Sequence, residues 1–161
     1  EILFIETSFT KGSGKVIITG QLGDVMKESA QIAITLVKSI YPDLAEKFEK
    51  NDLHIHVPAG AVPKDGPSAG ITLVTALSSL VTGKAVPAEI AMTGEVSLRG
   101  GVMPIGGLPE KLMAAQRAGV KHVFIPYENR DNLDDVAEEV KEKLEITLVK
   151  TVREVLANTI E

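Results

Sequence analysis

The sequence predicts an α+β domain, a compact mixed sheet with helices, and three observations favour this class. Apolar residues alternate in several short runs, they recur at helical spacing in others, and the two kinds of segment follow no regular strand–helix–strand repeat. With 161 residues, of which 44% are hydrophobic, the chain is long enough to bury one substantial core. We therefore predict a single domain over residues 1–161.

The first elements are predicted to be a hairpin and a helix. Residues 2–7 and 16–19 are runs of β-branched and other apolar residues. The link between them, residues 10–15, is polar and contains glycine, so we expect an antiparallel pair of strands. From residue 24 to residue 40, apolar side chains recur at helical spacing until Tyr41-Pro42 ends the pattern.

The middle of the chain is predicted to alternate between strands and one buried helix. Residues 53–57 alternate as a strand and lead into a loop, which precedes a helix that runs to about Thr82 and ends at Gly83. Two further strands are expected at residues 90–92 and 96–98. A turn at Arg99-Gly100-Gly101 then precedes a short strand at residues 102–104.

The last third is predicted to contain three helical segments and two strands. Pro109 fits the first turn of a helix that stops at Gly119. The remaining expected elements are a strand at 122–125, an acidic helical segment from about 132 to 144, a strand at 146–149 and a short helix from Val152.

Composition excludes several classes of function. The chain has no cysteine, so disulfides, thiolate catalysis and cysteine-bound metals are excluded. The net charge is -5 with both signs interspersed, which gives no broad basic surface for nucleic acid or for an anionic membrane. The longest apolar stretch, residues 71–81, is too short to span a bilayer. Because an apolar strand directly follows Glu1, we interpret the chain as a fragment of a longer polypeptide.

Ser68 is the strongest candidate for a catalytic nucleophile. It lies in the segment PKDGPSAG, residues 63–70, where we expect it in the first turn of the buried helix, next to backbone N–H groups that have no partner within the helix. Such donors stabilise an oxyanion, while Gly66 permits unusual backbone angles and Pro67 fixes the start of the helix. The alternative is that Ser68 only caps the helix.

Lys111 is the candidate general base, because a neutral lysine amine takes the proton of a serine hydroxyl. It lies in the first turn of its predicted helix, and the helix dipole there disfavours an ammonium. A shift of its pKa toward neutrality needs about 4 kcal/mol, more than a helix end supplies, so we expect the amine to be largely buried. A solvated surface lysine is the alternative.

Two further residues have candidate supporting roles. Thr93 follows a predicted strand, and its hydroxyl would hold the amine without adding charge. Asp65 would stabilise the protonated amine if it reached Lys111, so we expect it either to shape the loop with Gly66 or to act as a self-inhibitory partner.

Other candidate sites are weaker. Residues 12–15 resemble a phosphate loop but lack its first glycine and the hydroxyl residue that would bind Mg²⁺. His54 and His56 share one face of a strand, but no third metal ligand is evident, and we predict neither a metal nor a cofactor in this chain. A Ser-His-Asp triad that uses His54, His56 or His122 stays open. Glu6 is ranked as peripheral.

The motifs around these residues closely resemble the C-terminal proteolytic domain of Lon protease, of the bacterial and mitochondrial type. The resemblance covers essentially the whole chain. It rests on GDVMKES at 23–29, the run from His54 through Gly70, MTGE at 92–95, LRG at 98–100, PIGGL at 104–108 and IPYEN at 125–129.

This resemblance implies that Ser68 and Lys111 form a Ser-Lys dyad, with Thr93 near the amine. It also implies an acyl-enzyme mechanism, a six-membered ring, and unfolded polypeptide substrates delivered by an upstream ATPase domain in the bacterial cytoplasm or the mitochondrial matrix. ATP and Mg²⁺ would belong to that ATPase domain. The alternative is a non-catalytic oligomerisation module like the Lon-like domain of the DNA-repair ATPase RadA/Sms. A real dyad that is held inactive by a closed loop is a third reading.

Overall fold

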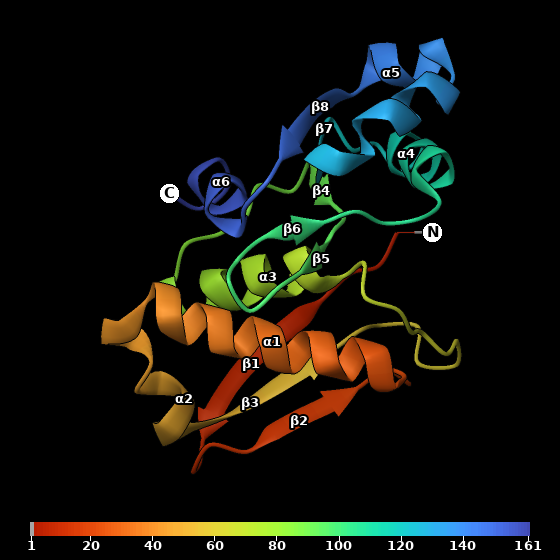
Figure 1. Cartoon of the computed structure of the whole chain (residues 1–161). Coiled ribbons are helices and arrows are strands. Elements are labelled where there is room, and N and C mark those ends of the chain that lie inside the picture. Colours follow the sequence, from red (N-terminus) through yellow and green to blue (C-terminus); the bar gives the residue numbers. More distant parts are fainter. Residues whose placement is uncertain (1) are drawn as a thin grey trace.

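The computed structural model describes residues 2–161, and its mixture of helices and sheets confirms the α+β class (Figure 1). The strands are β1 (Glu6–Lys11), β2 (Val16–Thr19), β3 (Asn51–His56), β4 (Ile90–Met92), β5 (Glu95–Val96), β6 (Val102–Met103), β7 (His122–Pro126) and β8 (Glu145–Val149). The α-helices are α1 (Asp24–Ile40), α2 (Lys47–Lys50), α3 (Gly70–Thr82), α4 (Leu108–Arg117), α5 (Glu138–Lys143) and α6 (Val152–Ala157). Two 3-10 segments are η1 (Pro42–Leu44) and η2 (Tyr127–Asp135).

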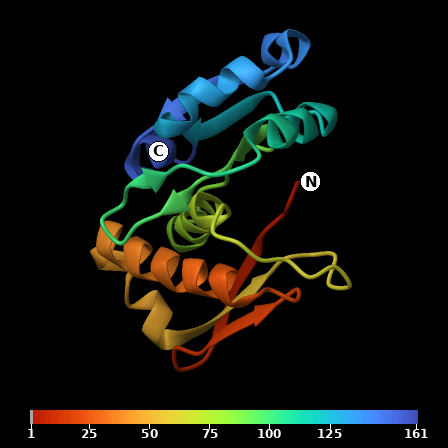
Figure 2. The same cartoon turned by 45° about the vertical axis from the view of Figure 1, so that its right-hand side comes forward.

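The elements stack in layers. A sheet with strand order β1-β3-β2 lies at the bottom of Figure 1, and helices α1 and α3 lie above it. A second sheet, β4-β7-β8, lies above these helices and has α4, η2 and α5 on its far side. The order of layers is the same in the rotated view of Figure 2. The hairpin β5–β6 lies between the helices and the second sheet.

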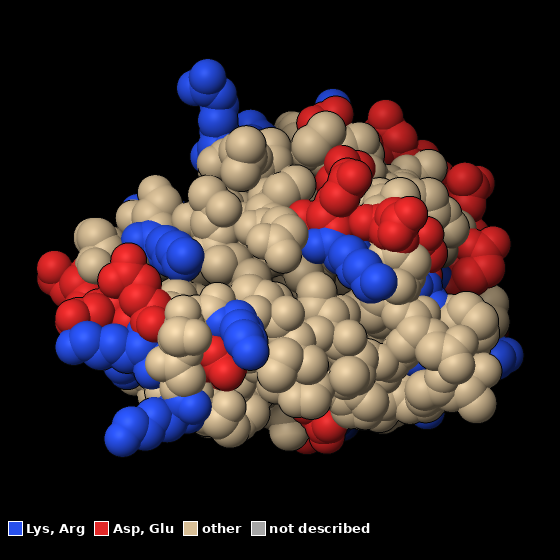
Figure 3. All heavy atoms as spheres, turned by 90° about the horizontal axis from the view of Figure 1, so that it is seen from below, with Lys and Arg blue, Asp and Glu red and all other residues tan. Residues whose placement is uncertain are grey.

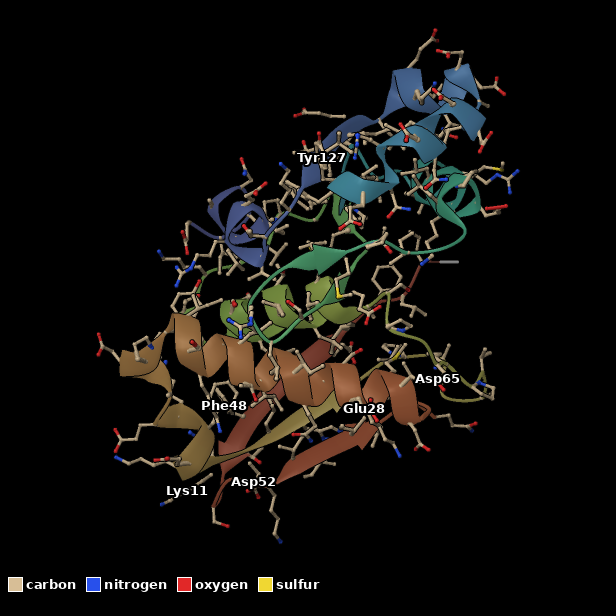
Figure 4. The ribbon with its side chains drawn as sticks, viewed as in Figure 1. Lys11, Glu28, Phe48, Asp52, Asp65 and Tyr127 are labelled. Carbon is tan, nitrogen blue, oxygen red and sulfur yellow. The ribbon has the colours of Figure 1, made fainter. Side chains whose placement is uncertain are left out.

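The predicted hairpin of the first two strands is wrong, because β3 lies between them. β3 pairs antiparallel with β1 and parallel with β2. The link between β1 and β2 therefore crosses the end of β3, where the Asp52 carboxylate accepts the backbone N–H groups of Ser13 (3.0 Å) and Lys15 (2.9 Å). Lys11 and Asp52 lie together at this end of the sheet in Figure 4. The polar link therefore does form a turn, but it connects β1 to β2 across the intervening strand β3.

The first strand also begins later than predicted. Residues 2–7 were expected to form it, whereas β1 runs from Glu6 to Lys11. Its ladder ends at the Glu6–His56 pair, where β3 also ends. A strand without a partner has no ladder of hydrogen bonds, so residues 2–5 are not part of the sheet.

The alternation of β3 explains how the lower core forms. Leu53 and Ile55 point toward the helices and are buried, whereas His54 and His56 lie on the opposite face. The predicted helix over residues 24–40 is confirmed as α1, and its buried side chains recur at helical spacing: Met26, Ser29, Ala30, Ala33, Ile34, Leu36 and Val37. The predicted end of α3 is also confirmed, because Gly83 closes it at φ 75° in the left-handed region.

The second sheet is buried on both faces. Along its central strand β7, Phe124 points into the core shared with α1 and α3, whereas Val123 and Ile125 point into a second apolar cluster with α4 and α5. Both ladders of this sheet are parallel, so β4 to β7 and β7 to β8 are crossover connections that the sequence analysis did not predict.

The predicted acidic helix from 132 to 144 is interrupted. The chain has η2 up to Asp135 and α5 from Glu138, with extended backbone angles at Val136 and Ala137 between them. Val136 is buried in the second apolar cluster, together with Val140. The extended pair allows both valines to reach that cluster.

The surface carries charges of both signs. Seen from below, Lys and Arg alternate with Asp and Glu around a face that is mostly uncharged (Figure 3). No helix within residues 2–161 has the length and apolar character needed to cross a membrane.

Candidate active site

Ser68 lies in a tight turn immediately before α3. Gly66 has φ 106°, and the turn is closed by the N–H of Gly70, which donates to the Pro67 carbonyl at 3.1 Å. A positive φ of this size strains any residue with a Cβ, which explains the glycine. The unusual backbone angle expected at Gly66 is therefore present.

The expected place of Ser68 within the helix is wrong by two residues. The helix begins at Gly70 with Ala69 as its N-cap, and no side chain caps it. The alternative that Ser68 is the N-cap is therefore also wrong. Pro67 already closes the backbone in a turn, so helical geometry starts only after Ser68.

Gly94 holds the Ser68 turn against the strand layer. Its N–H donates to the Ser68 carbonyl at 2.9 Å, and its carbonyl accepts the N–H of Ile71 at 3.0 Å. A Cβ at Gly70 would approach the Val96 side chain to 2.9 Å, so this close approach of helix and strand needs glycine.

This pairing changes which backbone donors are free. The first N–H groups of α3 were expected to lack partners within the helix, but those of Gly70 and Ile71 are both used, by the carbonyls of Pro67 and Gly94. Within residues 2–161, those of Ser68 and Ala69 have no backbone partner. These two groups are therefore the donors that remain beside the Ser68 hydroxyl.

Lys111 lies in the first turn of α4, as predicted. Gly107 adopts the left-handed region at φ 72°, and its carbonyl accepts the Lys111 N–H at 3.1 Å. The side chain is half-buried, and this burial lowers the pKa of the amine below its ordinary value. Desolvation is the cause of the lowered pKa, as expected. The amine was expected to be largely buried, however, and its burial is only partial.

The Thr93 hydroxyl is the partner of this amine. Lys111 Nζ donates to Thr93 Oγ1 at 3.4 Å. Thr93 is itself buried just after β4, and its N–H donates to the Phe124 carbonyl at 3.1 Å. The amine thus contacts a neutral acceptor that is fixed by the central strand of the second sheet.

Ser68 and Lys111 line the same two adjoining cavities. One has a volume of about 490 Å³ and is largely apolar, with walls from α3, α4, β4 and residues 2–5. The other, of about 500 Å³, is formed by six residues: Pro67, Ser68, Pro104, Ile105, Gly106 and Lys111. The fold therefore brings a hydroxyl and a partly desolvated amine, 43 positions apart in sequence, to one hollow of the surface.

Asp65 lies beside the start of α1 (Figure 4). Its carboxylate accepts the N–H of Met26 at 2.9 Å, and backbone N–H groups of Met26, Gly66 and Val25 lower its pKa. In this structure the carboxylate is therefore engaged with α1 and not with Lys111.

We expect Asp65→Ala to lower the melting temperature at about pH 7, because the first turn of α1 loses the one side-chain acceptor that residues 2–161 supply to it. The pKa of Asp65 is lower in the folded protein than its ordinary value of 3.8. The stabilisation is therefore fully present above pH 3.8 and is lost as the pH falls through the lower, folded-state pKa. Melting curves from about pH 7 to about pH 3 should show the gap between wild type and variant closing on acidification.

The exposed Asp134 provides the control for this prediction. Its carboxylate has no side-chain hydrogen bond or ion pair within residues 2–161. Asp134→Ala should leave the melting temperature nearly unchanged at both ends of the pH range. An Asp65 variant that melts like wild type at neutral pH would contradict the assigned capping role.

The histidines do not join the cavities. The Thr19 hydroxyl hydrogen-bonds to His54 Nε2 (2.9 Å) and His56 Nδ1 (2.7 Å) on the outer face of the lower sheet, and His122 Nε2 pairs with Thr147. No histidine of residues 2–161 lines either cavity beside Ser68. Across the same residues, no three His, Cys, Asp or Glu side chains gather as metal ligands do.

Sequence reasoning missed Lys64, which is buried beside the Ser68 loop. A single lysine in a polar loop ordinarily indicates a solvated charge, so the sequence carried no signal for its burial.

The fold places a serine turn and a half-buried lysine on one hollow, and comparison with known proteins defines the class of protein that has this sequence. All 161 residues match the family described as Lon protease (S16) C-terminal proteolytic domain. The chain belongs to this family.

Three relatives illustrate the similarity, each a protein named Lon protease. The one from Clostridium beijerinckii is 60% identical over 99% of this chain, and that from Methanosarcina barkeri is 53% identical over all of it. The one from Haemophilus influenzae is 56% identical, again over the whole chain. In each case the chain spans about a fifth (20%) of the relative's length.

Proposed function

We propose that this chain is a serine endopeptidase domain in which Ser68 is the nucleophile and Lys111 the general base. The observation that carries the proposal is that both side chains line the same cavities, while burial lowers the pKa of the Lys111 amine. A lysine with a lowered pKa is neutral more often at working pH, and only the neutral amine accepts a proton.

The proposed reaction has two stages. Ser68 Oγ attacks a peptide carbonyl as its proton passes to Lys111 Nζ, and Lys111 then gives this proton to the leaving amine. The product is an ester between the acyl group and Ser68. A water molecule that gives a proton to the same amine attacks this ester, and the proton returns to Ser68 Oγ as the acid product leaves.

Two features support the electrostatics of these steps. The N–H groups of Ser68 and Ala69 have no backbone partner within residues 2–161, which leaves them free to donate to a tetrahedral oxyanion. The Thr93 hydroxyl accepts from Lys111 Nζ without adding a negative charge, so it orients the amine and stabilises the protonated form less than a carboxylate would.

We also propose the wider setting that the family resemblance implies. The domain would act on unfolded polypeptides, within a six-membered ring, in the cytoplasm, after ATP-driven delivery by an ATPase region outside these residues. The domain itself would need neither ATP nor a metal. The alternative of a non-catalytic module like that of RadA/Sms is not favoured, since both dyad positions are filled and the relatives above carry the name protease.

The test is covalent labelling with a fluorophosphonate across pH, followed by mass mapping of the modified residue. We expect modification at Ser68, with a rate that rises with pH as Lys111 loses its proton below its ordinary pKa of 10.5. Lys111→Met, which keeps most of the length of the side chain but removes the amine, should abolish this rise. Modification at another residue, or an unchanged pH profile in the methionine variant, would overturn the dyad.

A further inference from the structure

Lys64 is a buried lysine whose ammonium is surrounded by backbone carbonyls. Only 8% of the residue is exposed. Its Nζ donates to the carbonyls of Gly20 (2.8 Å), Ala59 (2.7 Å) and Val62 (2.9 Å), with that of Val57 at 3.5 Å. We call these four oxygens the carbonyl cage.

The cage joins two segments that are distant in sequence. Gly20 follows β2, whereas the other three carbonyls belong to the end of β3 and the loop that leads to Ser68. The backbone of Lys64 reinforces this junction, because its N–H donates to the Gln21 carbonyl at 2.9 Å and its carbonyl accepts from Gly23 at 2.7 Å. The loop is therefore tied to the β2–α1 connection by both the side chain and the main chain of one residue.

The chemistry of the cage explains why a lysine is needed there. An ammonium has three N–H donors around one atom, and a buried charge is costly unless hydrogen bonds compensate it. Here the carbonyl dipoles compensate it, and within residues 2–161 no carboxylate pairs with this amine. Gly20 is shaped for the same contact: its φ is 113°, and a Cβ would collide with the Val57 carbonyl.

The anchored segment ends close to the nucleophile. Asp65, the next residue, holds the start of α1 through Met26, and only Gly66 and Pro67 then separate it from Ser68. On the other side, Ser68 is fixed by the N–H of Gly94. The space beside Gly66 is open: no atom lies within 4 Å of where a Cβ would be. Packing against neighbouring side chains therefore does not fix the loop at Gly66. Its position depends on the anchors at either side.

We propose that Lys64 is a positioning residue for Ser68: its ammonium in the carbonyl cage fixes the loop so that the serine hydroxyl faces Lys111. This inference rests on the proposed function. Lys64 does not touch the reacting atoms, and it acts on the reaction through the position of the Ser68 turn.

The central experiment compares Lys64→Met with wild type in fluorophosphonate labelling and in peptide cleavage. Methionine keeps most of the side-chain length but supplies no donor to the cage. We expect labelling of Ser68 to slow by about 10- to 100-fold, because a small misplacement of a reacting group has effects of this size. The loss should appear in kcat with little change in KM, and the pH at which labelling rises should stay the same, since Lys111 is unchanged.

Two further variants separate positioning from general stability. Lys47→Met is the matched control, because Lys47 Nζ also donates to a carbonyl, that of Val81 at 2.7 Å, at the far end of α3. It should lower the melting temperature without slowing the labelling of folded protein. Lys64→Arg should label at an intermediate rate, because a planar guanidinium keeps the charge but does not direct its N–H groups from one point.

Each outcome decides a specific claim. A folded Lys64→Met protein that labels Ser68 within about twofold of wild type overturns the positioning role and leaves the dyad intact. If that variant does not fold, wild-type labelling by Lys64→Arg has the same meaning. Absence of Ser68 labelling in wild type itself overturns the proposed function, and the positioning role with it.

Discussion

Ser68→Ala is expected to reduce peptide hydrolysis by at least about 10⁴-fold, because removal of the proposed nucleophile removes the covalent route altogether. The fold should be unaffected. Ser68 lies before α3, it does not cap that helix, and its carbonyl, which accepts from Gly94, is retained in alanine. Turnover of a fluorogenic peptide, measured beside circular dichroism, checks both expectations.

Ser79→Ala is the matched control for this result. Ser79 lies on α3, the helix that follows Ser68, and its hydroxyl donates to the Lys84 carbonyl at 2.6 Å, away from both cavities. This variant should lose some stability and keep its turnover. Substantial hydrolysis by a well-folded Ser68→Ala protein would remove Ser68 from the mechanism.

Phe124→Ala is expected to destabilise the fold by about 3–5 kcal/mol, the usual cost of a large cavity in a packed core. Phe124 has 0% exposure and lies on the central strand of the second sheet, facing the core shared with α1 and α3. For a chain of this size the melting temperature should fall by roughly 10 °C. Urea unfolding followed by circular dichroism measures the free energy of unfolding directly.

Phe4→Ala provides the comparison, since Phe4 is 68% exposed. Its removal should change the free energy of unfolding by no more than about 0.5 kcal/mol. Equal losses in the two phenylalanine variants would contradict the core assignment of Phe124.

Local pattern was sufficient to predict the long helices. The apolar spacing of α1 and the glycine that closes α3 are determined by neighbouring residues, so both ends of α1 and the C-terminal end of α3 were predicted correctly. Partners of strands are not local. Nothing within residues 2–19 indicates that a strand from residues 51–56 lies between β1 and β2, so the hairpin interpretation was reasonable and wrong.

The candidate site divides in the same way. The residue types at 68 and 111 suggested a hydroxyl and a base, and the helix that carries Lys111 was predicted correctly. The free backbone donors were not, because the first two N–H groups of α3, those of Gly70 and Ile71, donate to the carbonyls of Pro67 and Gly94. The carbonyl cage of Lys64 depends on two segments that are distant in sequence, and the residues next to Lys64 give no sign of it.

The central place of β3 also constrains how the chain folds. Its ladder with β1 joins residues about forty to fifty positions apart, so the lower sheet cannot start as a quickly formed hairpin. On a ribosome, β1 and β2 emerge before their common partner and stay unpaired until it follows them. The loop that leads to Ser68 comes directly after β3, so it acquires its anchors to the β2–α1 connection only when this late insertion is complete.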